Sequence, residues 1–150
     1  MNFTISTIAK SLADYLAPSF PDVSFFEDPN QQGSTTPCMF LQQRYAYVEP
    51  RRNNGYFLRR IGLDLTYLVD YNLPNMQQLY QAAAEQLDLL METIPYSDGE
   101  DTGLLRTHER QWRIDLDAMH YQFELQVWVT IPEDSVKMET MDYDERLKDG

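Results

Sequence analysis

Few residues of this chain could serve a nucleophilic enzyme. Cys38 is the only cysteine, and the only histidines are His108 and His120, so a thiol–imidazole pair would have to join Cys38 to one of these two. Cys38 lies in the run Pro37-Cys38-Met39-Phe40-Leu41, which is typical of the buried start of a strand. A reactive thiol needs a partly exposed setting that lowers its pKa, whereas a buried cysteine behaves as a small apolar side chain. We therefore predict a structural role for Cys38.

A carboxylate site for a divalent cation is the second possibility. Asp115 and Asp117 are two residues apart on a predicted strand, so both point the same way, and His120 follows closely. No ligand motif accompanies them. The residues that alternate with them are apolar, namely Trp112, Ile114 and Leu116. We therefore predict a solvated strand face rather than a metal site, and we interpret Asp64 and Asp70 in the same way.

Motifs for cofactors are absent from the sequence. It contains no G-x-G-x-x-G, no phosphate-binding P-loop, no G-x-S-x-G and no H-E-x-x-H. Six glycines in 150 residues leave little material for a phosphate-binding loop. The sequence predicts neither a cofactor nor an enzyme.

Positive charge is concentrated in one segment. Residues 44–60 contain one acid, Glu49, and five of the twelve bases, so they carry +4 while the rest of the chain carries −16. The five bases are all arginines, which pair bidentately with carboxylates or phosphates: Arg44, Arg51, Arg52, Arg59 and Arg60. One interpretation is a hairpin tip that charge keeps soluble. The other is a contact in which this basic segment meets an acidic surface of another subunit, and such a dipolar subunit favours head-to-tail association.

Composition limits the classes of protein to which the chain can belong. A chain of 150 residues fits one domain, and 43% apolar with 13% aromatic residues argues against global disorder. The net charge of −12 excludes the usual footprint of a dedicated nucleic-acid binder and counts against an anionic-membrane binder. No run approaches the about 20 apolar residues of a membrane-spanning helix, and residues 1–9 lack the basic start of a signal peptide. We expect a soluble protein of a reducing compartment.

The first half of the chain predicts a helix and a long hairpin. Apolar residues at spacings of three and four indicate an amphipathic helix over 2–16, with Asn2 or Thr4 as its cap. A brief strand over 23–26 and a polar loop over 28–36 follow. Two strands, 38–48 and 56–70, then form an antiparallel hairpin around Asn54-Gly55, because both of these residues tolerate positive φ. The residues of the second strand predicted to share its buried face are Ile61, Leu63, Leu65, Tyr67 and Val69.

The second half repeats this pattern. The sequence predicts a helix over 74–93, which Pro95 ends, and then a turn-rich acidic connection over 97–103. A second hairpin is predicted from strands at 104–119 and 121–131. Its last strand alternates cleanly and predicts a buried face made by Tyr121, Phe123, Leu125, Val127, Val129 and Ile131.

These elements predict an α+β fold. The expected order is α-β-β-β-α-β-β, an antiparallel sheet of two long hairpins packed against two amphipathic helices. We expect one domain over 1–132. Residues 133–150 carry seven acids and three bases without lasting periodicity, which predicts a mobile acidic tail.

The order and spacing of these features resemble one family, the tail terminator (tail-completion) proteins of long-tailed bacteriophages, and most closely the versions of Gram-positive-type phages and phage-like elements. The likeness spans residues 5–131. It includes the first helix running into Phe20-Pro21, the strand opened by residues 37–41, the basic loop around Arg51-Arg52, the strand Gly62-Leu63-Asp64-Leu65-Thr66-Tyr67, a central helix rich in Gln and Leu, and the closing pair of strands.

The resemblance implies a structural virion protein. Such proteins form a ring, usually a hexamer, that caps the tail tube, stops its polymerisation and offers a docking surface to the head connector. The partners implied are further copies of the chain, the tail tube protein and the head-connector or stopper protein. DNA would pass through a largely acidic channel without sequence-specific binding. The implied location is the head-proximal end of the virion tail, after assembly in the host cytoplasm.

Two other functions are compatible with the residues. The first is an acidic protein-binding module, such as a DNA-mimicking inhibitor or an immunity-type partner, which would concentrate acids on one folded face. The second is an enzyme with a carboxylate metal site, for which Asp115, Asp117 and His120 would be the ligands.

Overall fold

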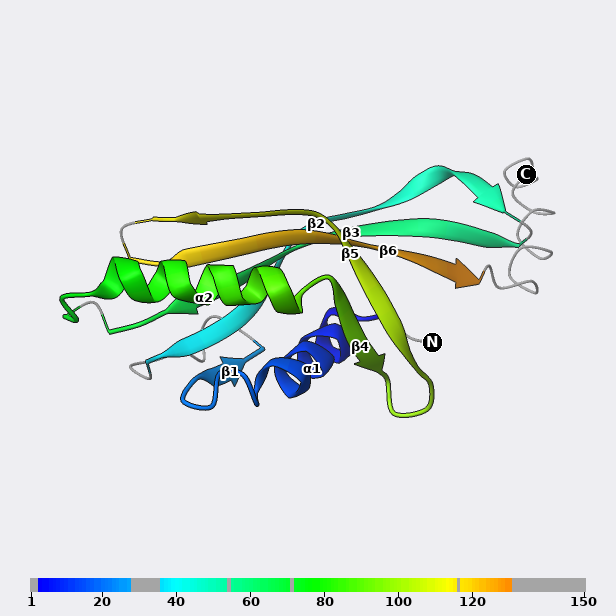
Figure 1. Cartoon of the computed structure of the whole chain (residues 1–150). Helices are drawn as coiled ribbons and strands as arrows, with labels where there is room; N and C mark the ends of the chain where they lie inside the picture. Colours follow the sequence, from blue (N-terminus) through cyan, green and yellow to red (C-terminus); the bar gives the residue numbers. More distant parts are fainter. Residues whose placement is uncertain (1–2, 28–35, 54, 71, 116, 131–150) are drawn as a thin grey trace.

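The computed structural model describes residues 3–27, 36–53, 55–70, 72–115 and 117–130. Within them, helices α1 (Ile5–Leu16) and α2 (Met76–Leu90) lie on one face of a six-stranded sheet (Figure 1). The strands are β1 (Ser24–Phe26), β2 (Cys38–Asn53), β3 (Tyr56–Leu68), β4 (Thr93–Ser97), β5 (Thr102–Ile114) and β6 (Met119–Thr130). The predicted α+β class with two helices beneath long hairpins is therefore correct.

The sheet is mixed rather than purely antiparallel. Its strand order is β1-β2-β3-β6-β5-β4, and every neighbouring pair is antiparallel except β1 with β2, which run parallel with Ser24 opposite Cys38. About a dozen residues separate β1 from β2, which is the length that a parallel connection needs. The prediction of an all-antiparallel sheet was wrong at this edge.

Helix α1 begins and packs as its sequence predicts. The Thr4 side chain accepts a hydrogen bond from the Thr7 backbone N–H at 3.1 Å, and the Thr7 hydroxyl accepts one from the Thr4 backbone N–H, so the first turn has a capping box. The apolar residues Ile8, Leu12 and Leu16 are buried. Of the two predicted caps, Thr4 is the one used.

Helix α2 is shorter than predicted, because residues 91–92 form a turn and a strand begins at Thr93. The helix ends at Leu90, and Thr93–Ser97 pairs with residues 102–106 as β4, giving the order α-β-β-β-α-β-β-β. Pro95 lies in this edge strand, where a missing N–H costs little. Ile94 and Tyr96 point into the core. The helical spacing continues through Ile94, which is why periodicity alone extended the helix.

The outer edge of β4 is covered by α1. The Ser11 hydroxyl donates to the Ser97 carbonyl and accepts from the Ser97 N–H, both at 3.1 Å, so one side chain satisfies both polar groups of that residue. The Tyr96 hydroxyl contacts Thr7 at 2.8 Å. These contacts join the first helix to the end of the sheet farthest from β1.

The β2–β3 hairpin forms as predicted. Asn53 pairs with Tyr56, and Gly55 has φ +84°, the left-handed conformation that a two-residue hairpin loop requires. Strand β2 reaches Asn53, five residues beyond its predicted end. The register shifts between Gln43 and Tyr45 and again between Val48 and Arg52. Such bulges bend and twist a strand.

The core lies between the helices and the inner face of the sheet. The residues predicted for the buried face of β3, Ile61 to Val69, are all buried, as are Tyr121, Phe123, Leu125 and Val127 of β6. Val129 is partly buried, and Ile131 lies outside the described residues. The predicted tail over 133–150 also lies outside them.

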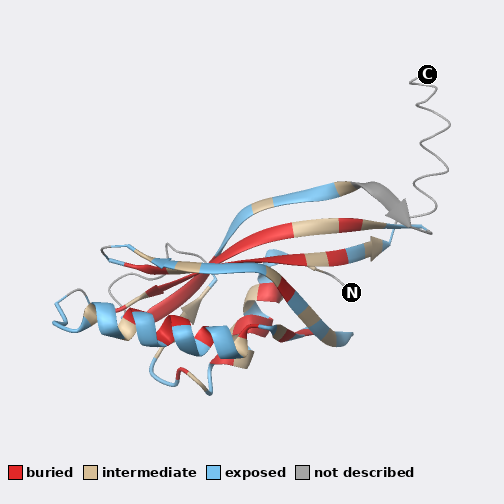
Figure 2. Cartoon of the chain, turned by 45° about the horizontal axis from the view of Figure 1, so that its top comes forward, coloured by how far each residue is buried: buried red, intermediate tan, exposed pale blue. Residues whose placement is uncertain are grey.

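Strands β2, β3 and β6 continue past the helices as a projection (Figures 1 and 2). We call this projection, residues 46–53, 56–60 and 126–130, the arm. Its side chains at residues 46–49, 56–60 and 126–130 are less buried than those of the body. The fold thus presents three distinct surfaces: the helical layer, the opposite face of the sheet and the arm.

Candidate functional site

Cys38 is fully buried at the start of β2. Burial raises the pKa of its thiol above the ordinary value, so the group is a poor nucleophile at neutral pH. The prediction of a structural cysteine agrees with this placement.

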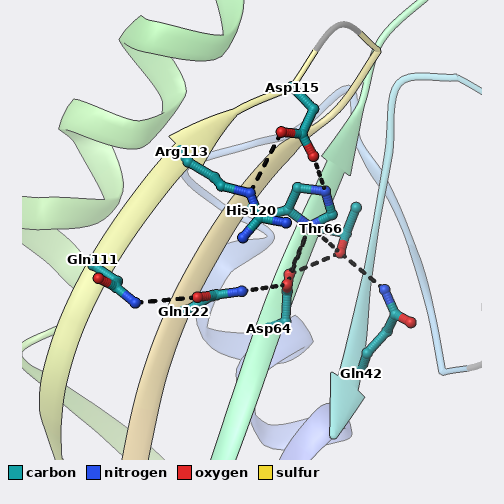
Figure 3. A network of polar contacts seen from close by, with 8 residues as sticks. All are labelled: Gln42, Asp64, Thr66, Gln111, Arg113, Asp115, His120 and Gln122. Carbon is teal, nitrogen blue, oxygen red and sulfur yellow. Dashed lines mark hydrogen bonds and ion pairs between the residues drawn. The ribbon is translucent and has the colours of Figure 1, made fainter. Parts of the chain in front are cut away.

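A polar network occupies the sheet face opposite the helices (Figure 3). At its centre, the Asp64 carboxylate accepts hydrogen bonds from the Thr66 hydroxyl at 2.9 Å and from Gln122 Nε2 at 3.1 Å. His120 Nδ1 lies 3.1 Å from the same carboxylate, and His120 Nε2 lies 3.2 Å from Asp115 Oδ2. The imidazole of His120, on β6, therefore bridges Asp64 of β3 and Asp115, which directly follows β5.

The network reaches four strands. Gln42 Nε2 on β2 donates to the Thr66 hydroxyl at 3.2 Å, and Gln111 Nε2 on β5 donates to Gln122 at 3.3 Å. Arg113 Nε contacts Asp115 at 3.4 Å. The backbone register explains the alignment, because Gln42, Asp64, Gln122 and Gln111 face one another across successive strand pairs.

The interpretation of Asp64 as a solvated residue is wrong. It is only 6% exposed rather than solvated, because cross-strand neighbours surround it. Asp70, Asp115 and Asp117 are exposed, as predicted. The alternation of β3 correctly assigns Asp64 to the polar face, but alternation carries no information about how closely neighbouring strands pack over that face.

The geometry supports neither nucleophilic catalysis nor metal binding by these residues. Thr66, Asp64 and His120 are the residue types of a hydroxyl nucleophile with its base, but Thr66 is only 2% exposed and a substrate has no access to its hydroxyl. Within the described residues, no three His, Cys, Asp or Glu side chains come together as a metal site. The network satisfies buried polar groups and fixes the register of four strands.

A second cluster lies farther along the same face. The Tyr45 hydroxyl donates to Glu124 Oε1 at 2.6 Å, and Arg60 Nη1 contacts Glu124 Oε2 at 3.0 Å. Arg60 also pairs with Glu49. Burial alone would raise the pKa of Glu124, but hydrogen bonds from Tyr45, Gln126 and Arg60 outweigh it and lower the pKa below its ordinary value. The bond to Glu124, with burial, raises the pKa of Tyr45 to about 12.

Gly62 makes this cluster possible. The Tyr45 ring lies directly on the Gly62 backbone, and a Cβ at that position would overlap the ring. The bulge at Arg44 re-aims β2 so that Tyr45 crosses over β3 to reach Glu124 on β6. A lone glycine in a strand signals such a close approach, and it is the one sequence feature that pointed to this cluster.

The five arginines of the predicted contact surface do not share one face. Arg44 is exposed at the bulge, with its guanidinium 5.4 Å from the Tyr45 ring. Arg60 is held by two glutamates on the polar face. Arg59 is on the inner face and contacts the Phe3 carbonyl at 3.5 Å. Arg51 and Arg52 belong to the backbone of β2 on the arm, and their side chains lie outside the described residues.

The arm also exposes large apolar side chains, which the sequence analysis did not single out. About half of the surface of each remains exposed, and they are Tyr47, Val48, Tyr56 and Trp128. Aromatic residues and arginine are enriched at protein interfaces. An aromatic residue such as Trp128 on the polar side of an alternating strand is the signal that could have found this surface.

Comparison with known proteins identifies the family. A family model described as phage tail terminator protein matches residues 7–137, which is most of the chain and includes all the strands, helix α2 and all but the first two residues of helix α1. A search of curated proteins gave no match. In the described part of the chain, no helix is long and apolar enough to cross a membrane. The chain belongs to the phage tail terminator protein family, a family of structural proteins of the phage tail.

Proposed function

We propose that copies of this chain form a ring, a hexamer by analogy with the family, that caps the tail tube, stops its polymerisation and offers a docking surface to the head connector. The ring would lie at the head-proximal end of the virion tail, after assembly in the host cytoplasm. The single observation that carries the proposal is the arm, a projection with exposed aromatic side chains in the most basic segment of an acidic chain.

In the monomer, the arm has an exposed strand edge and large exposed apolar side chains. Strand β1 pairs with β2 only over residues 38–40, so among the described residues the outer edge of the rest of β2 has no neighbouring strand. Exposed edges and large exposed apolar side chains are normally covered by a partner. Identical copies are the partners that a ring supplies.

The arginines are the part of this proposal that mutation tests most easily. We expect Arg51→Glu with Arg52→Glu to weaken ring assembly or docking, because it reverses the charge of the arm. The measurement is the yield of infective particles, and the length of tails by electron microscopy, when the variant replaces the wild-type protein in a phage. Lys137→Glu with Lys148→Glu is the matched control, since it makes the same change in net charge outside residues 44–60. Wild-type yield and tail length from the arm variant would remove these arginines from the proposed contact.

A further inference from the structure

Trp128 belongs to a group of exposed aromatic residues on the arm. It is 50% exposed and lies on the sheet face opposite the helices, directly across from Leu58 of β3. Tyr56 and Tyr47, each nearly half exposed, lie on the neighbouring strands of the same arm. Tryptophan, tyrosine and arginine dominate the residues that carry binding energy in protein interfaces.

A hollow of about 560 Å³ lies on the other side of the molecule, where α1 meets the β4–β5 hairpin. Apolar groups form much of its surface, including Tyr15, Pro95 and Leu104. Leu104 is 72% exposed, which is unusual for a leucine in a strand that pairs with a neighbour. The volume is in the range of about 300–1,000 Å³ that binding pockets occupy.

The surroundings of this hollow are acidic. Asp14, which pairs with Lys10, is part of its lining, and the turn that joins β4 to β5 contributes Asp98, Glu100 and Asp101 without a base between residues 97 and 105. The arm has the opposite character, since its residues include four arginines and one acid, Glu49. The two surfaces therefore differ in the sign of their sequence charge, and one presents an exposed aromatic group where the other has an apolar hollow.

We propose that the hollow between α1 and the β4–β5 hairpin receives Trp128 and its neighbours from the arm of a second copy of this chain. The inference rests on the proposed ring and names the two surfaces that meet in it. Because the surfaces are different and lie on opposite faces of the sheet, the contact is head-to-tail, and repetition of such a contact closes into a ring when the rotation permits. A two-fold contact, in which arm meets arm, is excluded by this arrangement.

Disulfide cross-linking between copies tests the contact. Trp128→Cys protein is mixed with Leu104→Cys protein, oxidised at the concentration at which the wild-type chain self-associates, and analysed by non-reducing gel and mass spectrometry of the linked peptides. We expect a covalent dimer that joins position 128 to position 104. Leu89→Cys replaces Leu104→Cys in the control mixture, because Leu89 is 85% exposed on α2 outside the hollow. The native thiol of Cys38 is buried and should not take part.

The outcomes separate this inference from the proposed function. A covalent dimer no more abundant than in the control mixture, from a wild-type protein that forms oligomers and completes tails, overturns the named contact and leaves the ring intact. A wild-type chain that stays monomeric at every concentration, and on tail tubes, overturns both. Cross-linking of Trp128→Cys to itself alone would also overturn the head-to-tail contact.

A second variant supports the test without new cysteines. We expect Trp128→Ala to weaken self-association at least about tenfold, which is the cost of losing a central interface residue. Trp128→Phe should retain part of the affinity, and Leu89→Ala should leave it unchanged. The dissociation constant comes from sedimentation velocity, and thermal unfolding of each variant shows that the fold is kept. Equal self-association of wild type and a folded Trp128→Ala would contradict the proposal.

Discussion

Asp64 and Glu124 are carboxylates on the sheet face opposite the helices, and both are buried, Glu124 to 4% exposure. Each is surrounded by polar partners from its own strand and from neighbouring strands: Thr66, Gln122 and His120 around Asp64, and Tyr45, Gln126 and Arg60 around Glu124. A buried charge is tolerated only when it is paired and hydrogen-bonded in this way. These two residues therefore stabilise the sheet as long as their partners stay in place.

Removal of the Asp64 carboxylate should destabilise the fold. Asp64→Ala leaves the buried hydroxyl of Thr66 and the amide of Gln122 without their acceptor, and unsatisfied buried groups cost about 1–3 kcal/mol each. We expect the free energy of unfolding, measured by urea denaturation, to fall by at least about 2 kcal/mol. Asp22→Ala, at an exposed aspartate, is the control and should change it by no more than about 0.5 kcal/mol. Equal effects of the two variants would show that the network contributes nothing to stability.

The ionisation of Glu124 makes the free energy of unfolding depend on pH. Its pKa is lowered in the folded protein, so the stabilisation is present above the unfolded pKa and is lost as the pH falls through the folded pKa. We expect Glu124→Gln to reduce the loss of stability between neutral pH and about pH 3, because protonation of the Glu124 carboxylate no longer contributes to that loss. Urea unfolding of both proteins at the two pH values measures the difference. A loss as large in Glu124→Gln as in the wild type would contradict the assignment.

The elements show what sequence patterns can and cannot predict. The β2–β3 hairpin and the inward face of β6 follow from Asn54-Gly55 and from strict alternation, which are local signals. Strand β4 is not predicted, because Ile94 continues the helical spacing and Pro95 resembles a helix stop. The parallel direction of β1 and the burial of Asp64 depend on which strands become neighbours, and periodicity within one segment does not encode that.

The approach of Tyr45 to Gly62 allows a test of how β2 bends over β3. Gly62→Ala should destabilise the protein by about 1–3 kcal/mol, because the added methyl group overlaps the Tyr45 ring. In a Tyr45→Ala background the same substitution should cost much less, since the ring is gone. Urea unfolding of the two single variants and the double variant gives the coupling. Additive effects would show that the ring is not what requires the glycine.

Where α1 meets β4, one hydroxyl satisfies both backbone polar groups of Ser97. Ser11→Ala leaves the N–H and the carbonyl of Ser97 without their partner, so we expect a loss of about 1–3 kcal/mol in the free energy of unfolding. Ser6→Ala, at an exposed serine of the same helix, should have a much smaller effect. Thermal and urea unfolding both report the change. If the two serines prove equivalent, the edge of β4 is satisfied by other groups.

The whole molecule is an acidic body with a basic, aromatic arm, and membership of the tail terminator family gives this asymmetry a context. The basic segment could be found from charge counting alone. The division of the basic segment between two sheet faces depends on the twist of β2. The hollow beside β4 depends on a strand that the sequence did not predict. The surfaces proposed to meet in a ring are thus built by the features that local sequence patterns do not encode.

The size of the assembled particle tests the central claim most directly. The protein is mixed with tubes of its cognate tail tube protein, and free and tube-bound material is measured by light scattering and negative-stain electron microscopy. The account predicts a closed ring of several copies of the 17.6 kDa chain at one end of each tube, and tubes that stop growing once it is present. Single 17.6 kDa molecules at every concentration, with tubes that keep growing and have bare ends, would contradict it.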